Sequence, residues 1–311
     1  MELTRRKVLA GGTAAWLLRN GPAPARAATI AAGGMTLGFS TYGMKSLTTE
    51  RAIKSVARLG FDAIEICVIE GWDADGASVA AGRREAIGRQ LVDSGLRLTA
   101  LMEHVHPETD SLQHKALERL KIAAGLAHAW CPAAPPLIQT TLGSGQWSQV
   151  RAPLRDRLGA WIELAEAEKV VLAIKPHRGG AMSQPADAVW LIEQLGRPDR
   201  LKMVYDYSHY AYRDLSIEAT VATALPYTAH VAVKDAIQEN QRVLFRLAGE
   251  TGALDFPRIL RLLAAGGYRG DVNCEVSGMV SSQPGYDPLS AAKICYTNMS
   301  RAFEQAGVAR A

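Results

Sequence analysis

The sequence is poor in cysteine, and this limits the kinds of site that it can form. Only four cysteines occur in 311 residues, and no two of them form a C-x-x-C pair. A dense disulfide framework, a zinc site and a dithiol redox centre are therefore not expected. Cys67 and Cys274 stand in strand-like apolar runs, so we expect them to be small core residues.

The sequence also has no apolar run that could cross a bilayer, which takes about 20 residues. The strongest candidate, residues 8–18, follows two arginines in TRRKVLA and precedes GPAPARAA, an A-x-A cleavage pattern that ends at Ala27. Paired arginines, a short apolar segment and this cleavage pattern are typical of a twin-arginine export signal. We expect residues 1–27 to be this signal. Residues 28–311 are then expected to be one domain, exported to the periplasm by the twin-arginine machinery, without a stable membrane span.

Outside this segment the sequence lacks a net charge. The formal charge is +4, but residues 1–27 contain five of the 35 basic side chains and one of the 31 acidic ones, so the remainder has 30 of each. No basic field is present that would attract nucleic acid, and a nucleic-acid partner is not expected. With 48% hydrophobic residues, the chain can bury a full core.

What the sequence does contain is an alternation of short apolar runs with amphipathic ones. Strand-like runs occur at residues 35–40, 61–68, 96–102, 136–141, 170–175, 201–206, 228–233 and 271–276. Helical patterns lie between them; one ends at Gly60 and another begins at Asp255, a helix-cap candidate. Eight such units predict a closed (β/α)8 TIM barrel of parallel strands. The alternative is an open doubly wound sheet, against which no G-x-G-x-x-G follows the first strand.

Chemically active side chains gather where these strands end, which is where barrels of this kind carry their sites. In chain order they are Glu65, His104, Lys175, His177, Asp206, His209, Lys234 and Glu275. A glutamate inside a covered strand, such as Glu65 or Glu275, must face the barrel mouth or be paired. Structural explanations are also open: Asp206 can cap the next segment, His209 can be an ordinary loop histidine, and His230 can be a core residue.

Together with the barrel pattern, these residues give the chain a resemblance to a known family. The segments LGFDAIEI, AIKPHRGG, VYDYSH, HVAVKDA, LAGETGALDF and NCEVSG make residues 35–303 similar to the sugar phosphate isomerase/epimerase family. These xylose isomerase-like barrels include endonuclease IV, hydroxypyruvate isomerase, inosose dehydratase and the ketose 3-epimerases. The resemblance implies a small carbohydrate or polyol substrate and a proton transfer next to a carbonyl.

The resemblance also implies a divalent metal (Mn, Mg, Co or Zn), whose ligands this chain only partly keeps. Asp206 and Glu275 match the ligands of the sixth and eighth strands, and His209 matches the neighbouring substrate-side histidine. Lys175 stands in place of the fifth-strand glutamate, and Ala232 in place of the seventh-strand histidine. Because a lysine and a divalent ion at one position repel each other, we expect no tightly bound metal. Asp206 and Glu275 are the expected ligands if one binds.

Two functions remain open on this basis. The first is a sugar or polyol isomerase or epimerase, or a keto-sugar lyase, in which Lys175 stabilises an oxyanion and Glu275 or His209 carries the proton. A Schiff base on Lys175 is a variant of it. The second is a non-catalytic carbohydrate-binding barrel. A DNA nuclease is excluded by the balanced charge and the missing ligands. The expected substrate-binding residues are Glu65, His104, His177 and Lys234.

Two further features concern the substrate. Gly249 and Gly252 in LAGETGALDF precede a helix and could hold an anion, although a tight turn explains them equally. Trp72, Trp147 and Tyr286 fall in or near expected loops on the same face, where they could stack on sugar rings or pack locally.

Overall fold

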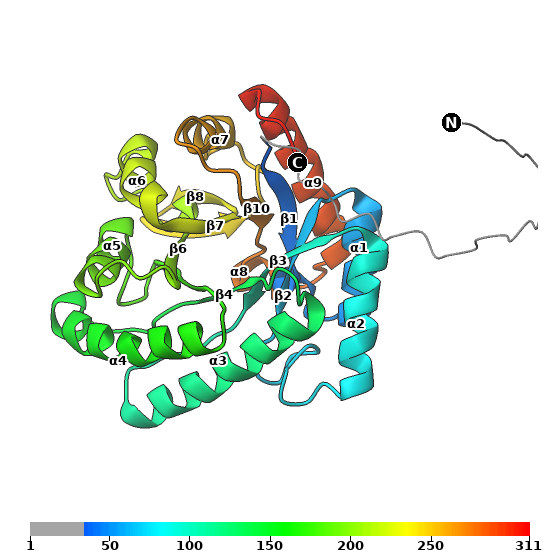
Figure 1. Ribbon diagram of the computed structural model, residues 1–311. Helices are drawn as coiled ribbons and strands as arrows, with labels where there is room; N and C mark the ends of the chain where they lie inside the picture. Colours follow the sequence, from blue (N-terminus) through cyan, green and yellow to red (C-terminus); the bar gives the residue numbers. More distant parts are fainter. Residues whose placement is uncertain (1–33) are drawn as a thin grey trace, which may run out of the picture. The chain divides into compact units, whose positions relative to one another are not determined.

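The computed structural model describes residues 34–311, and the expected export signal lies outside them. The described residues form a closed ring of eight parallel strands with helices around it (Figure 1). The order around the ring is β1-β10-β7-β6-β5-β4-β3-β2, and β2 pairs with β1 to close it. The predicted (β/α)8 barrel is confirmed, and the open doubly wound sheet is wrong.

Each strand of the ring lies inside one of the predicted runs. Helices cover the outside of the ring and side chains fill its inside, which is why these runs are apolar throughout instead of alternating. The strands are β1 (Thr36–Ser40), β2 (Ala63–Cys67), β3 (Arg97–Met102), β4 (Leu137–Thr140), β5 (Leu172–Ile174), β6 (Leu201–Tyr205), β7 (Thr228–Val233) and β10 (Asp271–Cys274).

The covering helices begin and end at residues that suit helix termini. Gly60 ends α1 with a φ of 90°, a left-handed conformation that a glycine adopts without strain. The Asp255 carboxylate accepts a hydrogen bond from the Arg258 N–H and caps α7, as predicted. The helices are α1 (Thr49–Leu59), α2 (Ala81–Ser94), α3 (Asp110–Trp130), α4 (Trp147–Ala167), α5 (Pro185–Gln194), α6 (Ile217–Ala224), α7 (Phe256–Ala265) and α9 (Pro288–Ala306).

Additional short elements follow several strands at their carboxyl ends, and the sequence did not predict them. An antiparallel hairpin of β8 (Asp235–Glu239) and β9 (Arg242–Arg246) follows β7, and a one-turn helix, α8 (Gly278–Ser281), follows β10. Short 3-10 helices η1 (Thr41–Met44) and η2 (Tyr207–His209) follow β1 and β6. These insertions build walls above one end of the ring.

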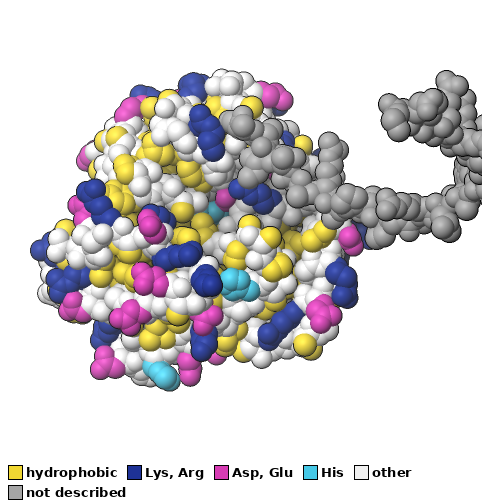
Figure 2. Space-filling model, viewed as in Figure 1, with side chains coloured by type: hydrophobic (Ala, Val, Ile, Leu, Met, Phe, Trp, Pro, Cys, Tyr) yellow, Lys and Arg dark blue, Asp and Glu magenta, His cyan; other side chains and the backbone are white. Residues whose placement is uncertain are grey.

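The core and the surface agree with the composition. Cys67 and Cys274 are buried and free, as expected of small core residues. On the face shown in Figure 2, basic and acidic side chains are intermingled and do not gather by sign, in keeping with the balanced charge. Within residues 34–311, every helix is too short or too polar to serve as a membrane span.

Candidate functional site

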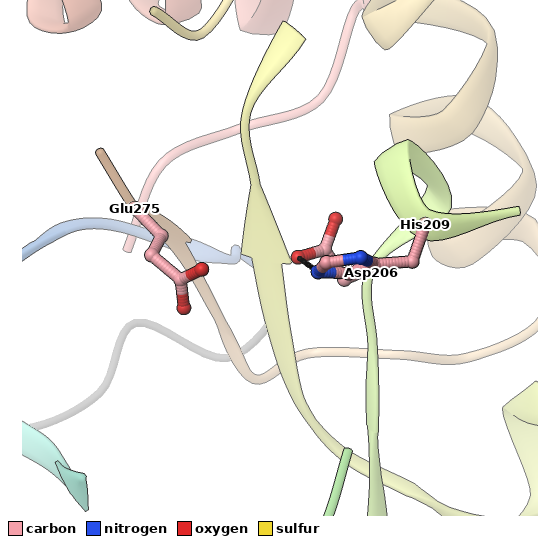
Figure 3. Close-up of side chains that lie close together, drawn as sticks. All are labelled: Asp206, His209 and Glu275. Atoms are coloured by element: carbon pink, nitrogen blue, oxygen red, sulfur yellow. Dashed lines mark ion pairs between the residues drawn. The ribbon is translucent and has the colours of Figure 1, made fainter. Parts of the chain in front are cut away.

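Two lysines and two carboxylates meet at the carboxyl ends of four neighbouring strands. Lys175 follows β5, Asp206 follows β6, Lys234 follows β7 and Glu275 follows β10. All four side chains are buried, with at most 6% of any of these residues exposed. Asp206 and Glu275 lie on either side of β7 (Figure 3). We call this group the four-charge cluster.

Each ammonium group of the four-charge cluster contacts both carboxylates. Lys175 Nζ lies 2.5 Å from Glu275 Oε2 and 3.3 Å from Asp206 Oδ2. Lys234 Nζ lies 2.5 Å from Asp206 Oδ2 and 2.9 Å from Glu275 Oε1. Because the two positive and two negative charges cancel, the cluster can be buried at a tolerable desolvation cost. The sequence predicted Lys175 to lie beside both acids, but it did not predict that Lys234 completes the pairing.

The cluster holds its members in their charged forms. Burial alone would raise the pKa of Glu275, but Lys175 and Lys234 hold it well below its usual value. Burial opposes ionisation of Asp206 too, yet Lys234 and Lys175 lower its pKa. For Lys175, burial acts to lower the pKa, and the carboxylates of Glu275 and Asp206 raise it above its usual value.

The side chains present do not fit a divalent metal. Asp206, His209 and Glu275 each have a possible ligand atom within 4.8 Å of the others (Figure 3). Both carboxylates, however, already contact two ammonium groups each. A divalent ion at this point would lie beside two ammonium groups that repel it.

A cavity of about 410 Å³ opens above the four-charge cluster. Lys175, Lys234 and Glu275 form part of its floor, and residues that follow β1, β3 and β4 form its walls. A lysine ammonium has three N–H groups. Lys234 donates two of them to carboxylates and Lys175 donates one to Glu275, so each lysine keeps at least one N–H for an oxygen atom in the cavity.

The two histidines beside the cluster have different positions. His177 lines the cavity, and its ring makes no hydrogen bond to another described residue. Burial, and next the charges of Lys175 and Lys234, lower its pKa to about 4, so it is neutral at pH 7. His209 is fully buried behind it, with the ring centres 4.1 Å apart. Burial and Lys234 hold the pKa of His209 well below its usual value.

The expected role of His209 as a proton carrier is therefore revised. Its Nδ1 lone pair is engaged by the Arg178 N–H, and its Nε2 faces Asp206 Oδ2 at 3.4 Å. His209 does not line the cavity. Its position suits a residue that supports the orientations of Asp206 and His177.

Among the expected substrate-binding residues, His104 and His177 line the cavity but Glu65 does not. Glu65 lies deeper in the ring, where Gln139 donates a hydrogen bond to Oε2 and His230 Nε2 lies 3.2 Å from the same oxygen. Glu65 is 1% exposed. The expectation that it contacts the substrate is therefore revised to a structural role.

His230 is the centre of a second buried charged group below the cavity. Its Nδ1 lies 2.5 Å from Asp271 Oδ2, and its Nε2 faces Glu65. Burial acts to lower the pKa of His230, but Asp271 and then Glu65 raise it to about 10. His230 is therefore a core residue, as one of the explanations left open by the sequence proposed. Its raised pKa means that it is charged at pH 7.

The glycine-bearing turn in LAGETGALDF binds an anion that belongs to the chain itself. The Asp235 carboxylate accepts hydrogen bonds from the backbone N–H groups of Thr251, Gly252 and Leu254 and from the Thr251 hydroxyl. This turn therefore fixes the residue that directly follows Lys234. The tight-turn explanation holds, because these amide groups are already occupied.

Sequence reasoning missed several residues that line the cavity. Tyr42 comes from η1, Gln139 from β4 and Phe245 from β9. Phe245 packs edge-on against the His209 ring, with centroids 5.1 Å apart, and Lys234 Nζ lies 5.2 Å from the Phe245 ring centre. Tyr42 is the second residue after a predicted strand, and this position could have indicated that it lies in the site.

The ring of parallel strands and the cavity at their carboxyl ends define a (β/α)8 barrel with its site in the usual place. The model of a family described as xylose isomerase-like TIM barrel matches residues 53–293. The chain belongs to this family, and the resemblance inferred from the sequence is confirmed.

Solved structures of similar fold include sugar epimerases. A 3-keto-D-glucoside 4-epimerase from E. coli is 16% identical with a TM-score of 0.68, covering 87% of this chain and 99% of that one. A D-psicose 3-epimerase, solved in the presence of D-fructose, is 16% identical with a TM-score of 0.68, covering 88% and 100%. A xylose isomerase-like TIM barrel protein from Mycobacterium smegmatis, in complex with magnesium, is 16% identical with a TM-score of 0.65, covering 88% and 98%. At these identities the likeness concerns the fold.

One curated relative matches a shorter stretch. The mouse (Mus musculus) protein named "Putative hydroxypyruvate isomerase" is 29% identical over 94 residues, which is 30% of this chain. The match spans 31% of the relative's own length.

Proposed function

We propose that this protein is an isomerase- or epimerase-type enzyme that moves a proton next to the carbonyl of a sugar or polyol. The observation that carries the proposal is the neutral four-charge cluster, which places two ammonium groups where the family resemblance implies a metal. The names of the similar epimerases and of the curated relative support this class of reaction.

The ammonium groups supply the electrostatic part of the proposed reaction. Abstraction of a proton from the carbon beside the carbonyl moves the electron pair of the C–H bond toward the carbonyl oxygen, which becomes an oxyanion. Lys175 and Lys234 each have an N–H that can bind this oxygen in the cavity. Asp206 and Glu275 keep both lysines charged and fixed in position.

His177 is the group best placed to carry the proton. It is neutral, it lines the cavity, and its ring nitrogens have no hydrogen-bond partner within residues 34–311. Its low pKa follows from burial and from the two lysines, and a developing oxyanion would offset the lysine charges and raise its basicity during the step. Glu275 is a weaker candidate because both lysines stabilise its ionised form.

The proposal predicts that the protein catalyses exchange of a substrate C–H for deuterium in D2O. Free ketoses and ketose-containing disaccharides would be incubated with the protein and followed by NMR. His177→Gln is expected to lower the exchange rate by about 10²–10⁴-fold, the usual contribution of a general base. In the wild type, exchange should fall as the pH drops through about 4, because His177 becomes protonated there.

His114 gives a matched control, since it is an exposed histidine on α3. His114→Gln is expected to leave exchange unchanged. If His177→Gln exchanged as fast as the wild type, another group would carry the proton. If the wild type bound sugars but exchanged none of them, the protein would be a non-catalytic carbohydrate-binding barrel.

We also propose that residues 1–27 direct export through the twin-arginine pathway to the periplasm, which the pattern TRRKVLA supports. Replacing Arg5 and Arg6 together by lysine is expected to leave uncleaved precursor in the cytoplasm, as measured by cell fractionation and mass spectrometry. Lys7→Arg keeps the arginine pair and should export normally. Normal cleavage after Ala27 in the double variant would argue against this signal.

A further inference from the structure

A second cavity lies directly beside the first, and the two share a border. It has a volume of about 460 Å³, similar to that of the cavity above the four-charge cluster. Tyr42 and Gly278 line both cavities. Gly278 has no side chain, so the border between the two cavities is formed by its backbone and by the Tyr42 side chain.

The second cavity carries groups that suit the binding of a sugar. Its lining contains the aromatic rings of Tyr42, Trp72 and Tyr286, the ammonium group of Lys45 and the hydroxyl groups of serines, with no histidine and no carboxylate. A flat aromatic ring covers the C–H face of a sugar, and hydroxyl groups around it can bond to the sugar's rim. The serines are Ser46, Ser281 and Ser282.

Trp72 is placed for contact with a ligand and not for support of the fold. Its ring is half-buried and stacks on Tyr42 with a centroid distance of 5.5 Å and an angle of 8° between the planes, and neither ring packs against the hydrophobic core. Trp147, by contrast, packs against the core and edge-on to Trp190. Lys45 covers part of Trp72, with Nζ 4.8 Å from the ring centre, and Lys45 is itself exposed, so a ligand on this face of the ring would displace its ammonium group.

The geometry points to a two-ring substrate: a disaccharide whose reacting ring lies over the four-charge cluster and whose second pyranose ring lies against Trp72. Each of the two adjoining cavities is in the size range of a small-ligand pocket, so the two together suit a larger ligand. This inference rests on the proposed function for the identity of the reacting ring. It assigns to Trp72 a specificity role that the reaction itself does not require.

Calorimetric titration with defined sugars tests the inference without relying on turnover. The probes are the monosaccharides glucose, galactose and fructose, and the disaccharides isomaltulose, lactulose and cellobiose. At least one disaccharide is expected to bind the wild type tenfold or more tightly than its component monosaccharides. Trp72→Ala should remove that gain and change monosaccharide binding by less than about twofold. Trp72→Phe, which keeps a flat ring, should retain part of it.

Trp147→Phe is the matched control, because Trp147 lines neither cavity. It should preserve the disaccharide preference. If no disaccharide bound more tightly than its components, or if the preference survived Trp72→Ala, the second-ring site would be disproved. Disaccharide binding that depends on Trp72, without deuterium exchange, would leave this inference standing and remove the proposed chemistry. Deuterium exchange of ketoses, combined with a disaccharide preference that is absent or survives Trp72→Ala, would do the reverse.

Discussion

Lys175→Met is expected to lower the rate of deuterium exchange by at least about 10²–10³-fold, the usual effect of removing one group that stabilises an oxyanion. Methionine keeps an apolar stem of similar length but has no N–H to donate. The change also leaves the buried cluster with one unpaired negative charge, which is expected to lower the free energy of unfolding by roughly 3–5 kcal/mol. Exchange rates by NMR and unfolding in denaturant measure the two effects separately.

A second variant separates chemistry from charge balance. Adding Glu275→Gln to Lys175→Met returns the net charge of the four-charge cluster to zero, so it should recover much of the lost stability. It should not recover exchange, because the ammonium group is still missing. Wild-type exchange in Lys175→Met would show that this lysine is not part of the reaction.

The purified wild-type protein is expected to contain far less than one equivalent of divalent metal per chain, and chelators should leave its rate of deuterium exchange unchanged. The reason is that two ammonium groups occupy the space between Asp206 and Glu275. One equivalent of metal in the wild type, lost on Asp206→Asn, would overturn the replacement of metal by lysine. The reaction would then be an ordinary metal-assisted one.

His230→Gln is expected to be strongly destabilising, although His230 lies outside the four-charge cluster. It would leave Asp271 and Glu65 buried without their positive partner, at a cost of roughly 3–5 kcal/mol. The wild type should also show a characteristic pH dependence. Because the folded-state pKa of His230 is raised to about 10, its stabilising contribution is complete below about pH 6.5 and is lost as the pH rises through 10.

Denaturant unfolding at pH 6, 8 and 10 tests this prediction. The free energy of unfolding of His230→Gln should be lower than that of the wild type and should change less between pH 6.5 and 10. The exposed His114 is the control, and His114→Gln should stay within about 0.5 kcal/mol of the wild type. Equal pH slopes for wild type and His230→Gln would contradict a charged His230.

The fold was largely predictable because its signals are local. Each barrel strand is a short apolar run, and the stops and caps at Gly60 and Asp255 act within a few residues. The β8–β9 hairpin was missed because its turn lacks the usual local signal. Its two-residue turn is Asn240–Gln241, with φ values of 46° and 64°, and this pair lacks the glycine that usually marks such a turn.

The candidate site was predictable in position but not in depth. Strand ends indicated Lys175, Asp206 and Glu275, and the structure brings them together. The sequence could not tell that Glu65 lies below the cavity or that His209 lies behind His177, because spacing along a strand does not give height above the barrel floor. The sequence also could not show that Lys234 pairs with Asp206 and Glu275, which follow two other strands.

The four-charge cluster comes from one continuous arc of the ring, β5, β6, β7 and β10, whereas the segments after β1 and β2 supply Tyr42 and Trp72. Substitutions at Tyr42 and Trp72 would therefore leave the balance of buried charge untouched. If the proposed function holds, the range of substrates could change during evolution at these two positions while the four-charge cluster is inherited intact.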